Sequence, residues 1–123
     1  MNNKPKTIFC DIDGTLCEYP YTSDMGGYDF DSKVMKPLSG TLKKLWDWDK
    51  AGHMIILTTG RKEGMRESTE RQLREAGIVY DRLIMGIGGG TRVVINDLKP
   101  DREGDTAIAI NLNRNEGIEN VKI

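Results

Sequence analysis

Thr7-Ile8-Phe9-Cys10-Asp11-Ile12-Asp13-Gly14 is the stretch of sequence that decides the fold. Its first four residues form a short apolar run, which predicts a buried strand that Asp-x-Asp-Gly ends in a tight turn. Asp11 and Asp13 flank a single residue, so both carboxylates can face one crevice while Gly14 lets the chain turn away. We therefore expect a strand over 7–10 that delivers two acids to one edge of a sheet.

Strands and helices alternate along the rest of the chain. Apolar residues recur at helical spacing after Pro37, with Gly52 as a stop signal, and again from Met65 to Ala76, with Gly77 as the stop. The first pattern predicts a helix over about 37–51. Further apolar runs predict strands over 53–58, 82–85, 92–96 and 106–110. This order is typical of an α/β fold with a three-layer, open, mostly parallel sheet, whose ligands lie beyond the carboxyl ends of its strands.

Two connections carry no such periodicity. Residues 17–36 combine Tyr19, Tyr21, Tyr28 and Phe30 with one proline and two glycines, so we expect a structured loop or small hairpin there, acting as a flap. The glycine-rich link 86–91 is too short to contain the crossover helix that a parallel pair of strands normally needs. The direction of the strand over 82–85 therefore stays open.

Composition bounds the class of protein. The chain has 123 residues, 30% of them charged, and a net charge of -1, which predicts one soluble domain over 1–123 without a broad basic surface for nucleic acid. No apolar run approaches the roughly 20 residues of a membrane span, and no signal region precedes the first strand. Cys10 and Cys17 are too few for a disulfide framework. We expect reduced thiols in a cytoplasmic protein without a membrane partner.

Three polar motifs each follow a predicted strand. They begin at Asp11, Thr59 and Asp97, so the expected topology brings them to one edge of the sheet. Thr59-Gly60-Arg61 offers a hydroxyl, backbone N–H groups and a cation at a helix start, which suits a phosphate group. Asp97 and Asp101 add hard oxygen ligands, which favour Mg²⁺.

Each motif also has an ordinary structural interpretation. Asp-x-Asp-Gly is a common polar turn or part of a calcium loop, although Thr15 and Leu16 stand where that loop needs Asp or Asn and then Gly. Thr59 alone would be a helix N-cap, and 97–101 alone a surface turn. The occurrence of all three motifs in this order favours a shared phosphate site.

The motifs resemble those of the haloacid dehalogenase superfamily. Residues 9–16 resemble its first motif, residues 55–61 its second, and residues 93–97 with Asp101 its acidic fourth motif. The resemblance implies that Asp11 is the nucleophile that becomes an aspartyl-phosphate and that Asp13 is the general acid and base. It implies further that Thr59 binds the phosphoryl group and that Mg²⁺ is held by Asp11, the main-chain carbonyl oxygen of Asp13 and Asp97, to which we add Asp101.

The family's third motif, a cation that contacts nucleophile and phosphate, has two candidates. Lys99 follows Asp97 closely, whereas Arg92 begins a predicted strand and so lies a strand length from its carboxyl end. We therefore favour Lys99 as the catalytic cation. Arg92 is assigned to substrate binding together with Gly60 and Arg61.

The resemblance implies a Mg²⁺-dependent phosphatase that hydrolyses phosphomonoesters through an aspartyl-phosphate. The segments where family members insert a cap domain are short here, so we expect no cap and an open site that accepts a small phosphorylated metabolite, such as a sugar phosphate or nucleotide. Thr-Gly-Arg is also similar to the 3′-phosphatase half of polynucleotide kinase-phosphatases, which makes a nucleic-acid end an alternative substrate. A non-catalytic phosphate- and Mg²⁺-binding regulatory module is a third alternative, and a homo-oligomer is left open.

Overall fold

The structure is a computed structural model that describes residues 4–22, 27–28 and 34–123, with only the backbone at 21–22 and 27–28. Its elements in chain order are β1 (Thr7–Asp11), β2 (Tyr21–Thr22), β3 (Gly27–Tyr28), α1 (Thr41–Lys50), β4 (Met54–Thr58), the 3-10 turn η2 (Glu63–Met65), α2 (Arg66–Ala76) and β5 (Arg82–Ile84).

The main sheet has the strand order β1-β4-β5, and both pairs of strands are parallel. This settles the direction of the strand over 82–84. The register pairs Asp11 with Thr58 and Thr58 with Ile84, so the three strands end at the same edge. An α/β fold with an open parallel sheet is therefore confirmed.

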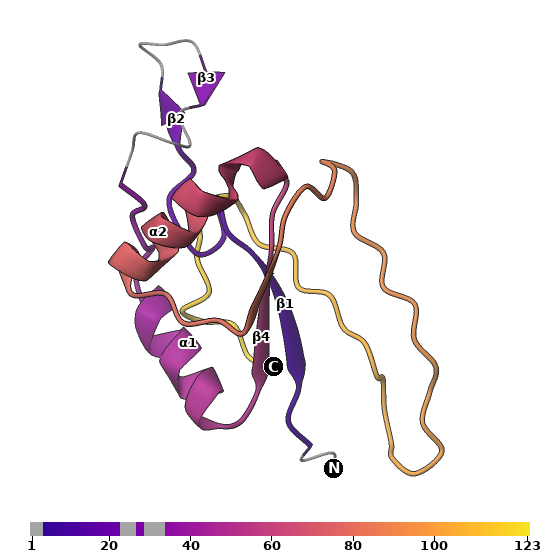
Figure 1. The fold of residues 1–123 in the computed structure, drawn as a ribbon. Coiled ribbons are helices and arrows are strands. Elements are labelled where there is room, and N and C mark those ends of the chain that lie inside the picture. The colour runs from indigo at the N-terminus through magenta and orange to yellow at the C-terminus, as the bar shows by residue number, and fades with distance from the viewer. Residues whose placement is uncertain (1–3, 23–26, 29–33) are drawn as a thin grey trace.

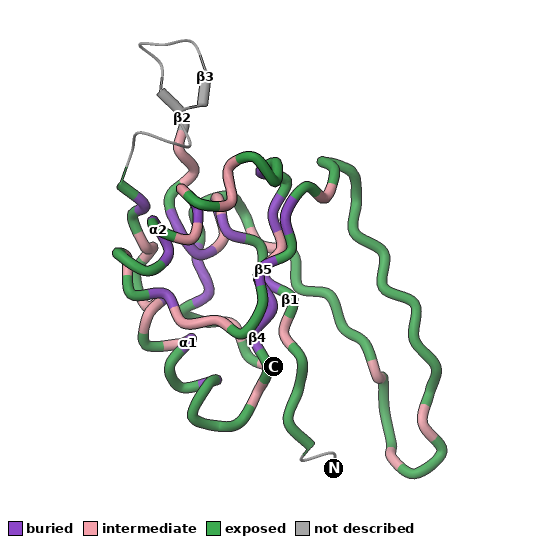
Figure 2. Tube along the Cα trace, viewed as in Figure 1, coloured by how far each residue is buried: buried purple, intermediate pink, exposed green. Residues whose placement is uncertain are grey.

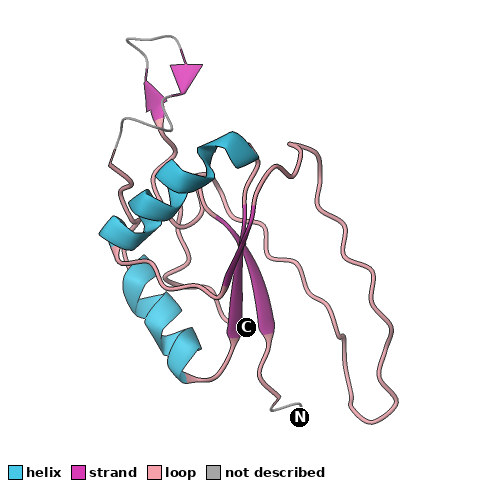
Figure 3. Cartoon of the chain, viewed as in Figure 1, coloured by secondary structure: helices cyan, strands magenta, loops and turns pink. Residues whose placement is uncertain are grey.

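The two helices lie together on the left of the sheet in Figures 1 and 3. The hydrophobic core lies between these helices and the strands. Apolar side chains of β4 pack into it, and the charged faces of the helices are in contact with water. The core includes the fully buried Ile12, Leu16, Leu45, Ile55, Leu57 and Leu73. Gly77 ends α2 in the left-handed conformation at φ 80, as expected for a helix stop.

Helix α1 begins at Thr41, later than the expected start at Pro37. The reason lies in the preceding residues, whose backbone pairs with the turn after β1. Leu38 N–H donates to Leu16 C=O at 2.9 Å, and Glu18 N–H donates to Lys36 C=O at 2.8 Å. These bonds hold 36–38 extended until Gly40, at φ 79, turns the chain into the helix.

Two predicted strands are wrong. Residues 92–96 and 106–110 form no strand; they belong to a long arm, residues 86–112, that extends on the right of the sheet in Figure 1. Figure 2 shows almost the whole arm as exposed, and Ile95 is 92% exposed. Asn96 Nδ2 donates to Thr106 C=O at 3.3 Å, one of the few bonds between its two limbs.

The short link explains why these segments are unpaired. For residues 92–96 to lie parallel to β1, on the side away from β4, the chain would have to cross the sheet after β5. Such a parallel crossover takes a dozen or more residues. The link 86–91 is about half as long, which is too short for such a crossover. The apolar, β-branched residues of the arm therefore have no neighbouring strand to pair with, and their composition alone does not supply one.

Within the segment expected to form a flap, the structure describes a two-stranded hairpin. Tyr21 pairs with Tyr28 in antiparallel register, while 23–26 and 29–33 lie outside the described residues, Phe30 among them. No helix among the described residues is long and apolar enough to cross a membrane.

Both cysteines are buried free thiols in the structure, as expected for reduced cysteines. Burial raises the pKa of Cys10 and that of Cys17 to about 12. Because the thiolate is the reactive form, we expect neither thiol to react with iodoacetamide at pH 8 in the folded protein, and both to react in guanidinium chloride. Mass spectrometry of the labelled protein measures this; rapid labelling of the folded chain would contradict the burial of these residues.

Candidate active site

Asp11 occupies the last position of β1, opposite Thr58 of β4. Strand alternation buries Cys10 and Ile12, so the residue between them is directed to the exposed side. After Ile12 the chain folds into a tight turn: the N–H groups of Leu16 and Cys17 donate to Ile12 C=O at 2.9 and 3.1 Å. The buried Ile12 and this turn fix Asp11 at the carboxyl edge of the sheet.

The pKa of Asp11 is raised above its usual range. The main cause is that the surrounding protein removes water from the carboxylate, and the charge of Asp13 adds to the effect. Three groups oppose the shift: the backbone N–H of Ile12, the Thr15 hydroxyl, which donates to Asp11 Oδ2 at 3.3 Å, and the charge of Arg92. Asp11 is thus a carboxylate whose charge a cation would stabilise.

Asp13 and Arg61 form a buried, two-pronged ion pair. Arg61 Nε donates to Asp13 Oδ2 at 2.8 Å, and Arg61 Nη2 donates to Asp13 Oδ1 at 2.7 Å. The side chain of Asp13 is only 11% exposed, and that of Arg61 only 4%. This geometry fixes the orientation of the Asp13 carboxylate, because a guanidinium fork matches a carboxylate in one plane.

Two residues of helix α2 accept hydrogen bonds from Arg61. Arg61 Nη1 donates to Thr69 Oγ1 at 3.1 Å and to Gln72 Oε1 at 2.7 Å, and both partners are buried. The sequence led us to expect that Arg61 contacts the substrate. In the structure, its side chain instead faces the protein interior. No sequence signal pointed to Gln72 as a partner of Arg61.

Thr59 follows β4 directly and is 2% exposed. Its Oγ1 accepts a hydrogen bond from Arg61 N–H at 3.1 Å, so the hydroxyl still has its own proton to donate. A side chain on Gly60 would bring its Cβ to 3.2 Å from Ile87 C=O, which explains why glycine suits this close approach. The Thr-Gly-Arg motif is therefore packed tightly at the same edge as Asp11.

The two candidate cations lie in different places. Arg92 Nη1 donates to Gly88 C=O and Gly90 C=O at 2.5 and 2.6 Å, and the charge of Arg92 reaches Asp11 strongly enough to lower its pKa. Lys99 instead forms an ion pair with Asp97 on the arm. The structure thus brings Arg92, and not Lys99, near the proposed nucleophile.

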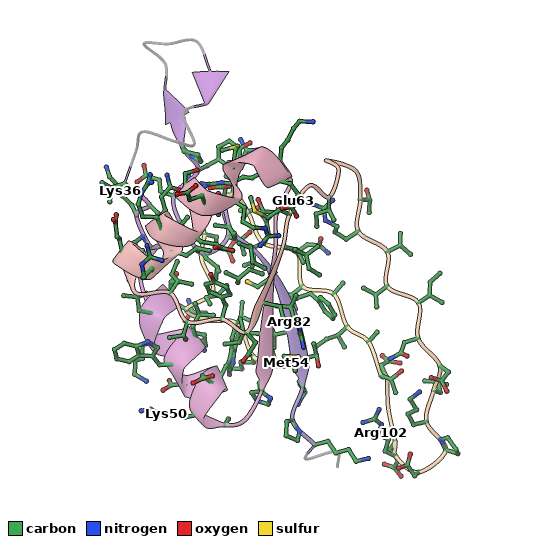
Figure 4. The ribbon with its side chains drawn as sticks, in the orientation of Figure 1. Lys36, Lys50, Met54, Glu63, Arg82 and Arg102 are labelled. Atoms are coloured by element: carbon green, nitrogen blue, oxygen red, sulfur yellow. The ribbon has the colours of Figure 1, made fainter. Side chains whose placement is uncertain are left out.

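Asp97 and Asp101 do not join Asp11. Asp101 lies 3.7 Å from Lys4, which precedes β1, and its neighbour Arg102 is at the tip of the arm in Figure 4, far from Glu63 at the carboxyl side of β4. The expected convergence of Asp97 fails because it depended on a strand over 92–96 that does not form. In the described part of the chain, no three acidic, histidine or cysteine side chains are grouped as metal ligands.

The remaining donors fit magnesium in a limited way. Mg²⁺ is commonly held by one or two carboxylates together with substrate phosphate oxygens and water. Asp11 offers one such carboxylate, and the carboxylate of Asp13 is occupied by Arg61. The protein part of a magnesium site here would consist of Asp11 with the main-chain oxygen of Asp13.

A cluster that sequence reasoning missed lies beside the turn after β1. Arg114 is stacked over the ring of Tyr19, with 3.9 Å between its Cζ and the ring centroid. Asn115 N–H donates to Gly14 C=O at 2.8 Å. The polar C-terminal tail carried no motif, so only the fold reveals that it returns to this turn.

His53 lies at the end of the sheet opposite Asp11. Its Nδ1 accepts a hydrogen bond from Lys6 N–H at 2.8 Å, just before β1 and β4 begin. It takes no part in the candidate site.

Solved structures include chains with a similar fold. A chain of the Pnkp1/Rnl/Hen1 RNA repair complex is 30% identical to this one, with a TM-score of 0.53; the match covers 72% of this chain and 28% of that one. A Vibrio cholerae protein is 18% identical, with a TM-score of 0.50, and the match covers 78% of this chain and 85% of that one. The D,D-heptose 1,7-bisphosphate phosphatase from B. bronchiseptica, complexed with magnesium and phosphate, is 21% identical, with a TM-score of 0.42, over 68% of this chain and 51% of that one.

This chain therefore spans less than a third of the length of its relative in the RNA repair complex. No protein-family model matches the sequence, and no curated protein matches it.

Proposed function

Because this chain has the α/β core of the haloacid dehalogenase superfamily, we propose that it is a phosphomonoester hydrolase in which Asp11 is the nucleophile. The observation that carries the proposal is the position of Asp11. It ends a parallel strand in register with Thr58, the residue before Thr59, and it is close enough to Asp13 to feel the charge of that carboxylate. A nucleophile, a proton carrier and a phosphate-binding hydroxyl therefore occupy one edge of the sheet.

In the first step, a carboxylate oxygen of Asp11 attacks phosphorus. The ester P–O bond breaks, and the departing alcohol oxygen takes the proton of Asp13, whose carboxyl group must be protonated when the substrate is bound. In the second step, water attacks the phosphorus of the aspartyl-phosphate and gives a proton to Asp13. Inorganic phosphate leaves, and both carboxyl groups return to their starting state, so the cycle needs no other reactant.

Arg61 serves this cycle by positioning Asp13. A carboxylate has roughly four lone-pair sites, and the fork of Arg61 uses two of them. The others remain able to carry a proton, in an orientation that the ion pair fixes. Arg61 is thus a positioning residue in this proposal and does not contact the substrate.

Magnesium is the proposed cofactor, held by Asp11 and the main-chain oxygen of Asp13. When bound, it would neutralise charge on the phosphate ester and so allow an anionic nucleophile to approach. Asp97 and Asp101 are left out of this site, because the structure places them on the arm. Removal of the metal with EDTA should stop phosphate release.

Arg92 takes the role of the catalytic cation in this proposal, in place of Lys99. We expect Arg92→Ala to lower kcat/KM by about tenfold or more, since a charge-assisted contact to an anion contributes roughly 1.5–3 kcal/mol. Lys99→Ala, which removes a charge paired with Asp97, should change kcat/KM by less than about twofold. Steady-state kinetics of both variants decides the matter, and the reverse ranking would return the role to Lys99.

The substrate class has two candidates. A small phosphorylated metabolite fits the expectation that the segments 17–36 and 86–91 are too short for a cap domain. A phosphorylated nucleic-acid end is favoured by the 30% identity to a chain of an RNA repair complex. Both place the same phosphomonoester at Asp11 and differ only in what is attached to it.

Phosphate release tests the proposal directly. The purified protein is assayed with Mg²⁺ or EDTA against sugar phosphates, nucleotides and 3′-phosphorylated oligonucleotides. Magnesium-dependent release from at least one of them is the expected result, and the preferred substrate chooses between the two classes. No release from any of these substrates, by protein that still binds Mg²⁺, would instead favour a non-catalytic binding module.

A further inference from the structure

The C-terminal stretch 113–116 is fastened to the turn that follows Asp11. Asn115 N–H donates to Gly14 C=O at 2.8 Å, and Tyr19 N–H donates to Asn115 Oδ1 at 2.8 Å. Asn115 adopts φ 65, a left-handed conformation that asparagine tolerates better than most residues. Two bonds that span almost the whole sequence therefore fix the position of Arg114, the residue before it.

The guanidinium of Arg114 lies over the ring of Tyr19 at 3.9 Å. Stacking uses the flat face of the guanidinium and leaves its N–H donors, which project in the plane, for other partners. Arg114 is exposed, and among the described residues it forms no ion pair with a carboxylate. Its orientation is thus set in advance, while its hydrogen-bonding edge has no acidic partner.

Arg114 and Asp11 adjoin the same turn. A side chain on Gly14 would bring its Cβ to 3.2 Å from Arg114 Cγ, and to the same distance from the Tyr19 ring. The next residue, Thr15, donates its hydroxyl proton to Asp11 Oδ2 at 3.3 Å. One tight turn therefore separates an oriented guanidinium from the proposed nucleophile.

We propose that Arg114, held on Tyr19, binds a second phosphate group of the substrate whose reacting phosphoryl group lies at Asp11. An oriented guanidinium fork matches the paired oxygens of a phosphate, and a net charge of -1 for the chain means that the attraction must come from a local group such as this. The second phosphate is either the phosphodiester next to a 3′-phosphorylated nucleic-acid end or the other monoester of a bisphosphate. This inference rests on the proposed phosphatase function and names what its substrate carries.

The test compares matched substrates that differ only in the second phosphate. One pair is a 3′-phosphorylated trinucleotide and a nucleoside 3′-monophosphate; the other is a sugar bisphosphate and the corresponding monophosphate. Arg114→Gln should cut the preference in kcat/KM for the doubly phosphorylated member by about tenfold. For the trinucleotide, the slope of log(kcat/KM) against log salt should fall by about 0.7, the value for one phosphate contact to a single strand.

The affected pair identifies the source of the second phosphate. An effect on the trinucleotide pair alone assigns a phosphodiester, and an effect on the sugar pair alone assigns a bisphosphate. Lys50→Gln, which removes one exposed charge from the last turn of α1, is the control and should leave both preferences unchanged. An unchanged preference in Arg114→Gln, with both pairs, would overturn the inference.

Substitutions of Tyr19 separate binding from folding. Tyr19→Phe keeps the ring and should keep the preference, whereas Tyr19→Leu removes the platform under Arg114 and should reduce the preference in the same direction as Arg114→Gln. Thermal melting of each variant reports whether the C-terminal stretch still stabilises the fold. If Phe and Leu at this position have equal effects on the preference, the ring does not orient Arg114 for the substrate.

A binding measurement keeps this inference distinct from the proposed function. In an Asp11→Asn background, fluorescence anisotropy follows a labelled 3′-phosphorylated oligonucleotide, and competition with the sugar bisphosphate covers the other source. Added Arg114→Gln should weaken binding of one of the two by about tenfold. This result can be obtained even if the protein releases no phosphate. If Arg114→Gln leaves the affinity for both ligands unchanged, the inference about Arg114 is contradicted, whereas the proposed phosphatase function is not.

Discussion

Asp11→Asn should lower phosphate release by about 10³-fold or more while the protein stays folded. The amide keeps the size of the side chain but cannot attack phosphorus to form an aspartyl-phosphate, and removal of a covalent nucleophile costs at least this much in other enzymes. The loss should appear in kcat with every substrate. Phosphate release at saturating substrate, with Mg²⁺ present, measures the effect.

The stability of this variant carries a second expectation. The raised pKa of Asp11 means that folding disfavours its charged form, mainly because the surrounding protein removes water from it. Asparagine has no charge to desolvate, so Asp11→Asn should melt no lower than wild type in EDTA at neutral pH. Activity lost without loss of stability is typical of a residue kept for chemistry.

Asp49→Asn is the matched control, since Asp49 is an exposed residue of α1 outside the site. It should retain wild-type activity and melting temperature. Two results would count against Asp11 as the nucleophile: substantial phosphate release by Asp11→Asn, or an equal loss of activity in Asp49→Asn.

The sequence was sufficient to predict the half of the site that lies on β1 and β4. Both strands are short apolar runs ended by polar motifs, and a parallel pair necessarily brings the ends of its strands to one edge. Asp11 and Thr59 therefore lie at the expected edge. The stop signals at Gly52 and Gly77 likewise fit the ends of α1 and α2 closely.

The prediction failed where it needed a partner that is distant in sequence. Val93, Val94 and Ile95 have the composition of a buried strand, yet they are 62–92% exposed. Strand composition describes how well a residue packs once a neighbouring strand is present, and it does not supply that neighbour. The position expected for Asp97 depended on this strand, so that expectation was wrong as well.

Side-chain direction was the other limit. Arg61 belongs to a motif that suggests contact with phosphate, but its guanidinium reaches inward to Asp13, Thr69 and Gln72. The spacing of a motif predicts where its backbone lies, but it does not predict the direction in which a long side chain extends. Two of these partners come from α2, whose position depends on the packed core.

Loss of the Arg61 fork has the second largest expected effect. Arg61→Met keeps most of the side-chain volume but leaves the carboxylate of Asp13 almost buried without its ion pair. Removing one partner of a buried pair typically costs about 3–5 kcal/mol, so we expect the free energy of unfolding to fall by about that amount. Denaturant unfolding measures it. Arg61→Met combined with Asp13→Leu should recover much of the loss, because no buried charge then remains unpaired.

The kinetic effect of Arg61→Lys distinguishes a positioning role from substrate binding. Lysine keeps the positive charge but loses the fork that orients Asp13. If Arg61 positions a general acid, kcat should fall about tenfold or more for an alkyl phosphate, whose leaving oxygen needs a proton, and much less for p-nitrophenyl phosphate, whose leaving group does not. If Arg61 instead binds the phosphoryl group, KM should rise equally for both substrates. The buried geometry of the Asp13–Arg61 pair leads us to expect the first pattern, since four of the five guanidinium N–H groups already donate to Asp13, Thr69 and Gln72.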